Sequence, residues 1–279
     1  MEDPWIRERM LFGSEALEKL NQSRVAVFGL GGVGGYAAEA LVRSGIGSID
    51  LTDPDVYAPS NLNRQLHATR STLGVPKTEA VKNRILDIRP DCIVTVHPVF
   101  FLPETASLFD FSAYDYVVDA VDTVTAKLAL AKAAGDAGVP VISSMGTGNK
   151  TDPSALRVSP IEETSVCPLA RIMRRECRRR GIHGLKAVWS AEEPLRPLFT
   201  PQEKPAADAS RRDIPGSTAF VPAAAGLLMA SVVGKTQSQN KHSHNSSLVS
   251  TVIRDPQFLQ IPCLVAIFLV LYTFTYKMV

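Results

Sequence analysis

The stretch RVAVFGLGGVG, residues 24–34, decides the fold of this chain. Residues 25–28 are all apolar, and glycines follow at once with the spacing GxGxxG. Glycines in this pattern let phosphate oxygens approach the backbone N–H groups at the start of a helix. The stretch therefore predicts a strand, a helix and, between them, a phosphate-binding loop. That loop comprises Gly29, Gly31, Gly32 and Gly34.

Outward from this loop, short runs rich in Val and Ile alternate with helical patterns. Such alternation is typical of βαβ units and a mostly parallel sheet. The fold class is therefore α/β, a Rossmann-like, doubly wound, mainly parallel sheet. We expect strands at residues 24–28, 48–52, 92–97, 116–120 and 140–144, and helices at residues 33–44, 77–88 and 125–137.

The pattern changes after residue 150. We assign residues 1–150 to a nucleotide-binding domain and residues 151–234 to a C-terminal α+β extension that completes the same domain. The extension is expected to contain strands at 155–159 and 186–190, an arginine-rich helix at 168–180, a Pro-rich loop at 194–215 and a final helix at 219–233 that breaks at Gly234.

The C-terminal tail differs in composition from the rest. We expect residues 235–257 to form a linker that is polar at its start. Residues 258–276 form an apolar run close to the roughly 17–25 residues that span a membrane. Gln260 and Pro262 near its start weigh against a transmembrane helix. Two interpretations stay open: a membrane anchor, which predicts membrane contact, and an artefact of the gene model.

The composition narrows the class of protein. The chain has 279 residues, is 45% hydrophobic and carries a net charge of only +2, the make-up of a globular protein. Its four cysteines include no CxxC pair, which argues against a disulfide framework and a zinc ribbon. Residues 1–9 are charged and lack the apolar core of a signal peptide. We therefore expect a cytoplasmic catalytic domain.

Asp53 ends the second expected strand, about twenty residues beyond the glycine loop, where a carboxylate accepts hydrogen bonds from a ribose diol. An NAD-dependent dehydrogenase fits this feature as well as an ATP enzyme does. The next segment separates the two classes, because a hydride-transfer site has little use for its phosphate-seeking groups. These are Asn61, Arg64 and Gln65 in SNLNRQ, residues 60–65, and Lys77 at the head of a helix.

With these motifs, the chain from Arg7 to Ser144 resembles the ubiquitin-activating enzyme superfamily, whose bacterial members include the ThiF and MoeB type adenylyltransferases. The resemblance implies the ThiF-type adenylating fold, with ATP and Mg²⁺ as cofactors. It implies that Asp53 holds the ATP ribose, that Asp122 binds Mg²⁺, and that phosphates are contacted or oriented by Asn61, Arg64, Gln65 and Lys77. Attack of a carboxylate on the α-phosphate builds negative charge, which Arg64, Lys77 and Mg²⁺ would stabilise.

Arg7 lies six residues before Gly13, like the superfamily's N-terminal arginine that reaches the ATP of a neighbouring subunit. The resemblance therefore implies a homodimer in which Arg7 contributes to nucleotide binding. Arg9 is an alternative in the same segment, and an ordinary exposed arginine in a helix is another.

Further motifs are similar to the tRNA threonylcarbamoyladenosine dehydratase branch of the superfamily, also called TcdA or CsdL. They are NRQLHA at 63–68, YVVDAVDT at 116–123, SSMGTGNK at 143–150 and FVPAAAG at 220–226. This branch adenylates the carboxylate of the modified nucleoside, and an internal group then displaces AMP and closes a ring. No catalytic cysteine is required, and we interpret Cys167 as structural.

The arginine-rich helix is the expected contact with tRNA, because arginines on successive turns can meet several phosphates. The candidate tRNA-binding residues are Arg171, Arg174, Arg175, Arg178, Arg179 and Arg180. A solvated basic face is the other interpretation.

Two rival functions stay open. The same site would serve an enzyme that activates the C-terminus of a ubiquitin-like or sulfur-carrier protein, with a sulfur-transfer protein as partner. A non-catalytic nucleotide-binding module is the other rival.

Overall fold

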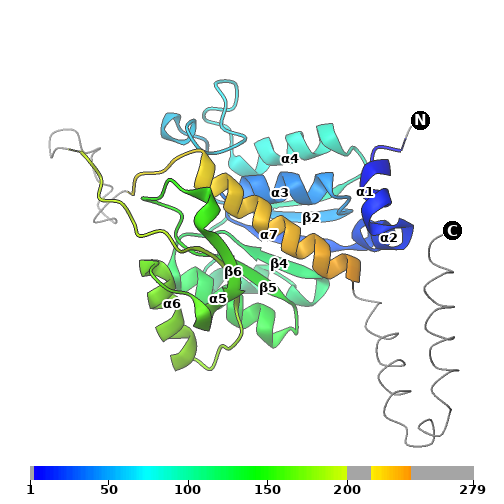
Figure 1. The fold of residues 1–279 in the computed structure, drawn as a ribbon. Helices are drawn as coiled ribbons and strands as arrows, with labels where there is room; N and C mark the ends of the chain where they lie inside the picture. Colours follow the sequence, from blue (N-terminus) through cyan, green and yellow to red (C-terminus); the bar gives the residue numbers. More distant parts are fainter. Residues whose placement is uncertain (1–2, 200–214, 240–279) are drawn as a thin grey trace, which may run out of the picture. The chain divides into compact units, whose positions relative to one another are not determined.

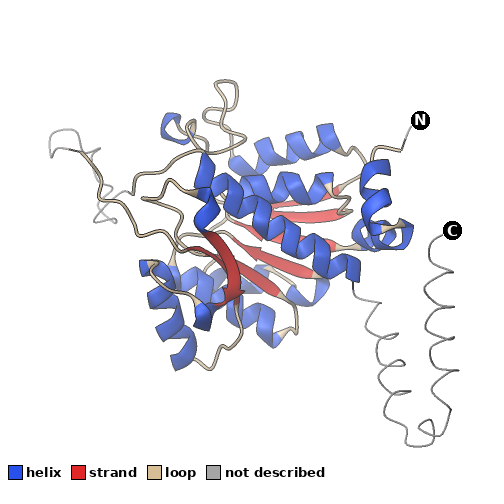
Figure 2. Ribbon diagram, in the orientation of Figure 1, coloured by secondary structure: helices blue, strands red, loops and turns tan. Residues whose placement is uncertain are grey.

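The computed structural model describes residues 3–199 and 215–239, in which helices cover both faces of one sheet (Figures 1 and 2). Within these residues the sheet has seven strands in the order β3-β2-β1-β4-β5-β7-β6. All neighbouring strands are parallel except β6 and β7, which are antiparallel. The strands are β1 (Arg24–Phe28), β2 (Ser48–Thr52), β3 (Ile93–His97), β4 (Tyr116–Asp119), β5 (Val141–Ser144), β6 (Leu156–Pro160) and β7 (Lys186–Ser190).

The longer helices form two layers. On one face of the sheet lie α3 (Gly34–Arg43), α4 (Lys77–Ile88) and α7 (Phe220–Gln239). On the other lie α5 (Val124–Asp136) and α6 (Pro168–Arg179). Shorter elements are α1 (Ile6–Phe12) and α2 (Ser14–Gln22), before the sheet, and the 3₁₀ turns η1 (Pro59–Asn61), η2 (Pro103–Leu108), η3 (Phe111–Ala113), η4 (Pro153–Ala155) and η5 (Ile161–Glu163).

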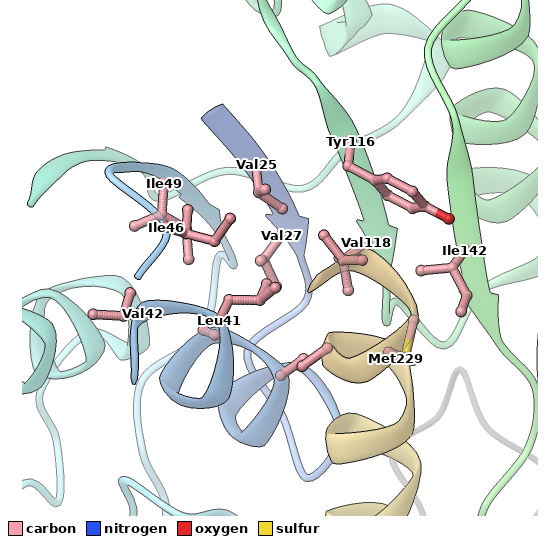
Figure 3. Close-up of a cluster of buried hydrophobic side chains, with 14 of the residues drawn as sticks. Val25, Val27, Leu41, Val42, Ile46, Ile49, Tyr116, Val118, Ile142 and Met229 are labelled. Atoms are coloured by element: carbon pink, nitrogen blue, oxygen red, sulfur yellow. The ribbon is translucent and has the colours of Figure 1, made fainter. Parts of the chain in front are cut away.

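The main core lies between the sheet and the layer of α3 and α7. Figure 3 shows Val27 of β1 and Val118 of β4 facing Leu41 of α3 and Met229 of α7. Phe28, the next residue of β1, packs on the opposite face with the aromatic cluster beneath α5. Because both faces are covered, β1 is apolar along most of its length instead of alternating. Burial of each such side chain contributes roughly 1.5–3 kcal/mol.

The predicted α/β fold class, with its doubly wound, mainly parallel sheet, is confirmed. The five strands and three helices expected between residues 24 and 144 agree with the structure to within one residue at each end. β7 and β6 continue the sheet beyond β5, so residues 156–190 share one sheet with the strands before residue 150.

The predicted break of the last helix at Gly234 is wrong. Helix α7 continues to Gln239, so residues 235–239 belong to a helix and not to a linker. One glycine inside a helix costs only about 1 kcal/mol. Beyond it, the Gln237 side-chain amide donates a 3.0 Å hydrogen bond to the backbone oxygen of Asp115 and fastens the last turn to the start of β4.

No helix of the described residues is both long and apolar enough to cross a membrane. The apolar run at residues 258–276 lies outside the described residues, as does most of the expected linker. The Pro-rich loop is described only at its two ends.

Candidate active site

The glycine loop follows β1, at the carboxyl edge of the sheet where β2 lies on one side of β1 and β4 on the other. Gly29 has φ +87°, and a Cβ there would lie 2.7 Å from the backbone oxygen of Ala120. A Cβ on Gly34 would lie 1.7 Å from the backbone oxygen of Gly29. Only glycine fits either position, and the loop packs directly on the segment that follows β4. Ligands of doubly wound folds bind at such a switch point.

Asp53, which follows β2, holds the glycine loop in place. Its Oδ2 accepts a 2.7 Å hydrogen bond from the backbone N–H of Leu30, and its Oδ1 accepts one of 2.9 Å from that of Asp55. The residue is 6% exposed. An ionised carboxylate has about four acceptor sites, so these bonds leave capacity for a ribose hydroxyl.

Lys77 starts α4 and is buried at the same edge. Its Nζ lies 2.8 Å from Asp55 Oδ2 and 3.5 Å from Asp53 Oδ1. The structure therefore brings together Lys77 and Asp53, two residues that the resemblance assigns to ATP. It also adds Asp55, whose carboxylate neutralises the lysine, so an incoming phosphate would compete with Asp55 for the ammonium.

Arg64 is a half-buried cation beside the glycine loop. A Cβ on Gly32 would lie 3.5 Å from Arg64 Cγ. The guanidinium donates to the backbone oxygen of Ser60 at 2.7 Å and to Asn63 Oδ1 at 2.9 Å. Neither acceptor is a carboxylate, and burial lowers the pKa of Arg64. A cation held in this way, with no ion pair in the described part of the chain, is suited to bind an anion.

Gln65 and Asn61 are neighbours of Arg64 in the same turn. Gln65 is buried, and its Nε2 would lie 3.7 Å from a Cβ on Gly31. Its Oε1 is buried with no hydrogen-bond partner among the described residues, as expected of a group that meets a ligand. Asn61 Oδ1 accepts a 3.0 Å bond from the backbone of Ala58, so this side chain also shapes the turn.

Asp122 is exposed in the segment between β4 and α5, next in chain to the residues that touch Gly29. The described residues contain no group of three His, Cys, Asp or Glu side chains that could hold a metal ion. A Mg²⁺ ion often binds one or two carboxylates together with substrate phosphates. Asp122 fits that kind of site.

Arg7 does not join these residues in its own chain. It is exposed on α1, close to Trp5, whose indole N–H donates a 2.8 Å bond to the backbone oxygen of Arg43 at the end of α3. The glycine loop lies at the opposite end of α3 (Figure 1). Arg9, the alternative, pairs with Asp3 at 2.8 Å.

The arginine-rich helix α6 begins at the same edge of the sheet. Buried Cys167 precedes it and lies against Gly146, beyond the end of β5, with Sγ 3.9 Å from the Gly146 oxygen. Arg174 donates to the backbone and hydroxyl oxygens of Thr164. Glu176 forms ion pairs with Arg175, Arg179 and Arg180. Arg171 and Arg178 are exposed and have no partner in the described part of the chain.

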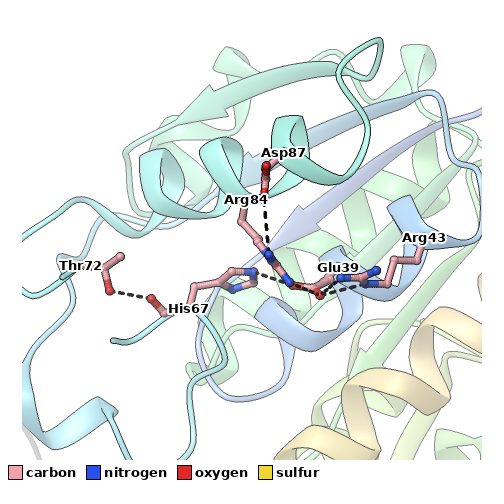
Figure 4. Close-up of polar contacts among 6 residues, drawn as sticks. All are labelled: Glu39, Arg43, His67, Thr72, Arg84 and Asp87. Atoms are coloured by element: carbon pink, nitrogen blue, oxygen red, sulfur yellow. Dashed lines mark hydrogen bonds and ion pairs between the residues drawn. The ribbon is translucent and has the colours of Figure 1, made fainter. Parts of the chain in front are cut away.

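Sequence reasoning missed a charged network behind the site (Figure 4). Buried His67, two residues after Gln65, places Nε2 3.4 Å from Glu39 Oε2 on α3. Glu39 also accepts hydrogen bonds from Arg43 and from Arg84 of α4. The contact with His67, followed by those with the two arginines, holds the pKa of Glu39 well below its usual range. The network joins α3, α4 and the turn that carries Arg64.

Comparison with known proteins places this geometry in a family. The ThiF family model matches residues 6–262. The tRNA threonylcarbamoyladenosine dehydratase of Bacillus subtilis is 42% identical over 228 residues, which cover 80% of this chain and 90% of that protein. The Escherichia coli enzyme of the same name is 36% identical over 195 residues, covering 67% and 73%. The crystal structure of E. coli TcdA in complex with ATP has a TM-score of 0.76 and 31% identity, covering 87% and 98%. This chain belongs to the ThiF family.

Proposed function

We propose that this protein is an ATP-dependent tRNA threonylcarbamoyladenosine dehydratase, which converts the nucleoside to its cyclic form. The observation that carries the proposal is the half-buried Arg64 guanidinium, which lies against the glycine loop without a carboxylate partner in the described residues. The buried, unbonded Gln65 oxygen beside it marks the same place as a ligand site. The names of the B. subtilis and E. coli relatives support the choice of substrate.

The reaction has two steps that balance. A carboxylate oxygen of the nucleoside attacks the α-phosphorus of ATP, and pyrophosphate leaves. An internal nucleophile of the same modification then attacks the activated carbon, and AMP leaves with the former carboxylate oxygen, so the nucleoside loses one water. Arg64 and Lys77 stabilise the charge that develops on the phosphates, and Asp53 orients the ribose.

Mg²⁺ is part of the proposal, and Asp122 is the residue that would hold it together with phosphate oxygens of the nucleotide. When bound, the ion would supply positive charge that offsets the negative charge developing on the phosphates. The chain's own part in this is to hold Ala120 and Val121, the residues just before Asp122, against the glycine loop.

A homodimer belongs to the same proposal. Helix α1 leaves large apolar side chains exposed, with Met10 at 79% and Leu11 at 82%, and Ile6 is 51% exposed. An apolar helix face of this kind is typical of a contact with another protein surface. We propose that a second copy packs on this face and that Arg7 then serves the neighbouring active site, as the resemblance implies.

The proposed tRNA contact is the exposed face of α6, which starts beside Gly146 at the edge that carries the site. Its five arginines and Arg180, which caps it, are balanced within this segment by Glu176 alone, which leaves an excess of positive charge. A sulfur-transfer partner and membrane contact through residues 258–276 stay predictions.

The test is direct. The purified full-length chain is incubated with ATP, Mg²⁺ and tRNA that carries threonylcarbamoyladenosine, and the digested tRNA is analysed by mass spectrometry. We expect the nucleoside to lose one water, and the loss to vanish in Asp122→Ala. An intact nucleoside, with ATP–pyrophosphate exchange that depends on a small carrier protein, would show that the protein activates a carrier instead.

A further inference from the structure

A buried ion pair lies beneath the segment that carries Asp122. Asp119 ends β4 and is 1% exposed, and Lys127 on α5 is 0% exposed. The lysine Nζ lies 3.2 Å from both carboxylate oxygens of Asp119 and 3.3 Å from the hydroxyl of Ser143. The Ser143 hydroxyl in turn donates to Asp119 Oδ2 at 2.5 Å. Ser143 is the register partner of Asp119 on β5, so the three groups join two strands and a helix.

The ion pair reaches the site through the backbone. Asp119 Oδ1 also accepts a 3.2 Å hydrogen bond from the backbone N–H of Val121. Ala120, between Asp119 and Val121, packs its backbone oxygen against Gly29 and its Cβ against Gly34. The Asp119 carboxylate therefore sets the direction of the chain at the residue just before Asp122.

The same pair also closes the chain on the other side of Asp122. The Lys127 backbone N–H donates a 3.1 Å bond to Thr123 at the start of α5, while its side chain returns to Asp119. Asp122 thus lies in a short loop of chain whose first and last residues are joined by a fully buried ion pair. A loop closed in this way has few conformations left.

Stability alone does not explain this arrangement. Removing two charges from water is costly, and apolar side chains of similar volume often serve a core as well or better. The pair also separates two carboxylates by role. Lys127 neutralises Asp119 inside the protein, whereas Asp122, three residues further on, is exposed.

We propose that Lys127, Asp119 and Ser143 are positioning residues that hold the Asp122 segment against the glycine loop, in the geometry in which Asp122 binds the Mg²⁺ of the bound nucleotide. The inference rests on the proposed adenylating function. It concerns residues behind Asp122, and none of the three is expected to touch the nucleotide itself.

The test replaces the pair without leaving a buried charge unpaired. The full-length double variant Asp119→Leu/Lys127→Met is compared with the wild-type chain by calorimetric titration of ATP, once with Mg²⁺ and once with EDTA. The matched control is Asp136→Leu/Lys132→Met, which removes the exposed ion pair of the same helix with the same substitutions. Thermal unfolding of each protein reports the stability.

We expect ATP binding in Mg²⁺ to weaken by about tenfold in the double variant, the usual scale for residues behind a metal ligand. Binding in EDTA and the Tm should change little, and the control should behave as the wild type. Equal weakening with and without Mg²⁺, or unchanged binding in both, would overturn the inference. So would a wild-type chain that binds ATP equally well with and without Mg²⁺.

Ser143→Ala keeps the proposal testable if the double variant does not fold. It removes one hydroxyl and leaves the ion pair in place, so a smaller Mg²⁺-dependent loss of about threefold is expected. No loss in a folded Ser143→Ala would count against the inference. A wild-type chain that binds ATP with Mg²⁺ but leaves the tRNA nucleoside intact would contradict the proposed function, and the binding comparison would still decide this inference.

Discussion

The backbone N–H of Leu30 donates a 2.7 Å hydrogen bond to Asp53 Oδ2, and this bond ties the glycine loop to the end of β2. Asp53 therefore has a structural duty in addition to the ribose contact proposed for it. One carboxylate performs both roles, so a substitution of Asp53 affects both the shape of the glycine loop and the affinity for nucleotide.

Asp53→Asn should lower both stability and nucleotide affinity. The amide has only one acceptor oxygen, so one of the two backbone donors, of Leu30 or Asp55, loses its partner at a cost of roughly 1–3 kcal/mol. We expect a lower Tm in thermal unfolding and ATP binding weakened about tenfold in calorimetry. Asp136→Asn, which changes an exposed carboxylate on α5 away from the site, is the control. Weaker binding with an unchanged Tm would contradict the structural role.

Arg64→Ala should reduce the rate of adenylation without destabilising the fold. The guanidinium is half-buried without an ion pair in the described residues, so its removal relieves burial of a charge. Loss of one preorganised charge at a reacting phosphate typically costs about 10²–10³ in rate. ATP–pyrophosphate exchange measures the rate, and Tm measures the fold. Exposed Arg70 in the same segment supplies the control Arg70→Ala, which should retain full activity.

Glu39→Gln should destabilise the protein at neutral pH and much less in acid. The pKa of Glu39 is depressed in the folded protein by His67, Arg84 and Arg43, so its carboxylate contributes stability above its ordinary pKa of 4.5. This contribution is lost as pH falls through the lower, folded-state pKa. Urea unfolding of both proteins from pH 7 down to acid should show the difference in free energy shrinking below pH 4.5. A difference that stays constant with pH would contradict this account.

Arg171→Glu/Arg178→Glu should impair the use of tRNA and leave ATP binding intact. These two arginines are exposed and unpaired within the described residues, so they are available to phosphates. We expect the KM for tRNA to rise by at least about tenfold, since each reversal replaces an attraction by a repulsion. Lys132→Glu on α5 makes the same kind of charge change away from α6 and should leave the KM alone. An unchanged KM in the α6 variant would exclude this helix as the tRNA contact.

Subunit mixing tests the proposed role of Arg7. If Arg7 acts on the neighbouring subunit, Arg7→Ala and Arg64→Ala are each inactive alone. A mixed dimer then carries both defects in one site and none in the other. Random exchange of equal amounts should restore about a quarter of wild-type activity. A mixture that stays inactive, although co-purification of differently tagged subunits shows that mixed dimers have formed, would place Arg7 outside the partner's site.

How far the sequence predicted the structure depended on whether the signal was local. Helix α4 was predicted at Lys77–Ile88 because its helical pattern ends before Pro90, and β1 because its apolar run ends at Gly29. The resemblance assigned Asp53 and Lys77 to one ATP site, and the structure places Lys77 Nζ 3.5 Å from Asp53 Oδ1.

Contacts between distant residues could not be read in the same way. Glu39 and His67 are 28 positions apart, and no pattern in either segment predicts that they meet. The buried pair of Asp119 and Lys127 was missed although both residues lie in a predicted strand and a predicted helix. A lysine in a helix is ordinarily exposed, so burial was not expected. The end of α7 was missed because the bond between Gln237 and Asp115 depends on the finished sheet.

Glu176 gives the basic helix an internal counterion. Three of the six arginines already share its carboxylate, which is fixed to the helix and cannot diffuse away when a nucleic acid arrives. Binding of a polyanion gains entropy by releasing mobile ions, at about 0.9 ion for each phosphate neutralised. An arginine that exchanges Glu176 for a phosphate releases fewer such ions. The affinity of α6 for tRNA should therefore fall less steeply with salt than six arginines would suggest. The helix should also bind other polyanions only weakly.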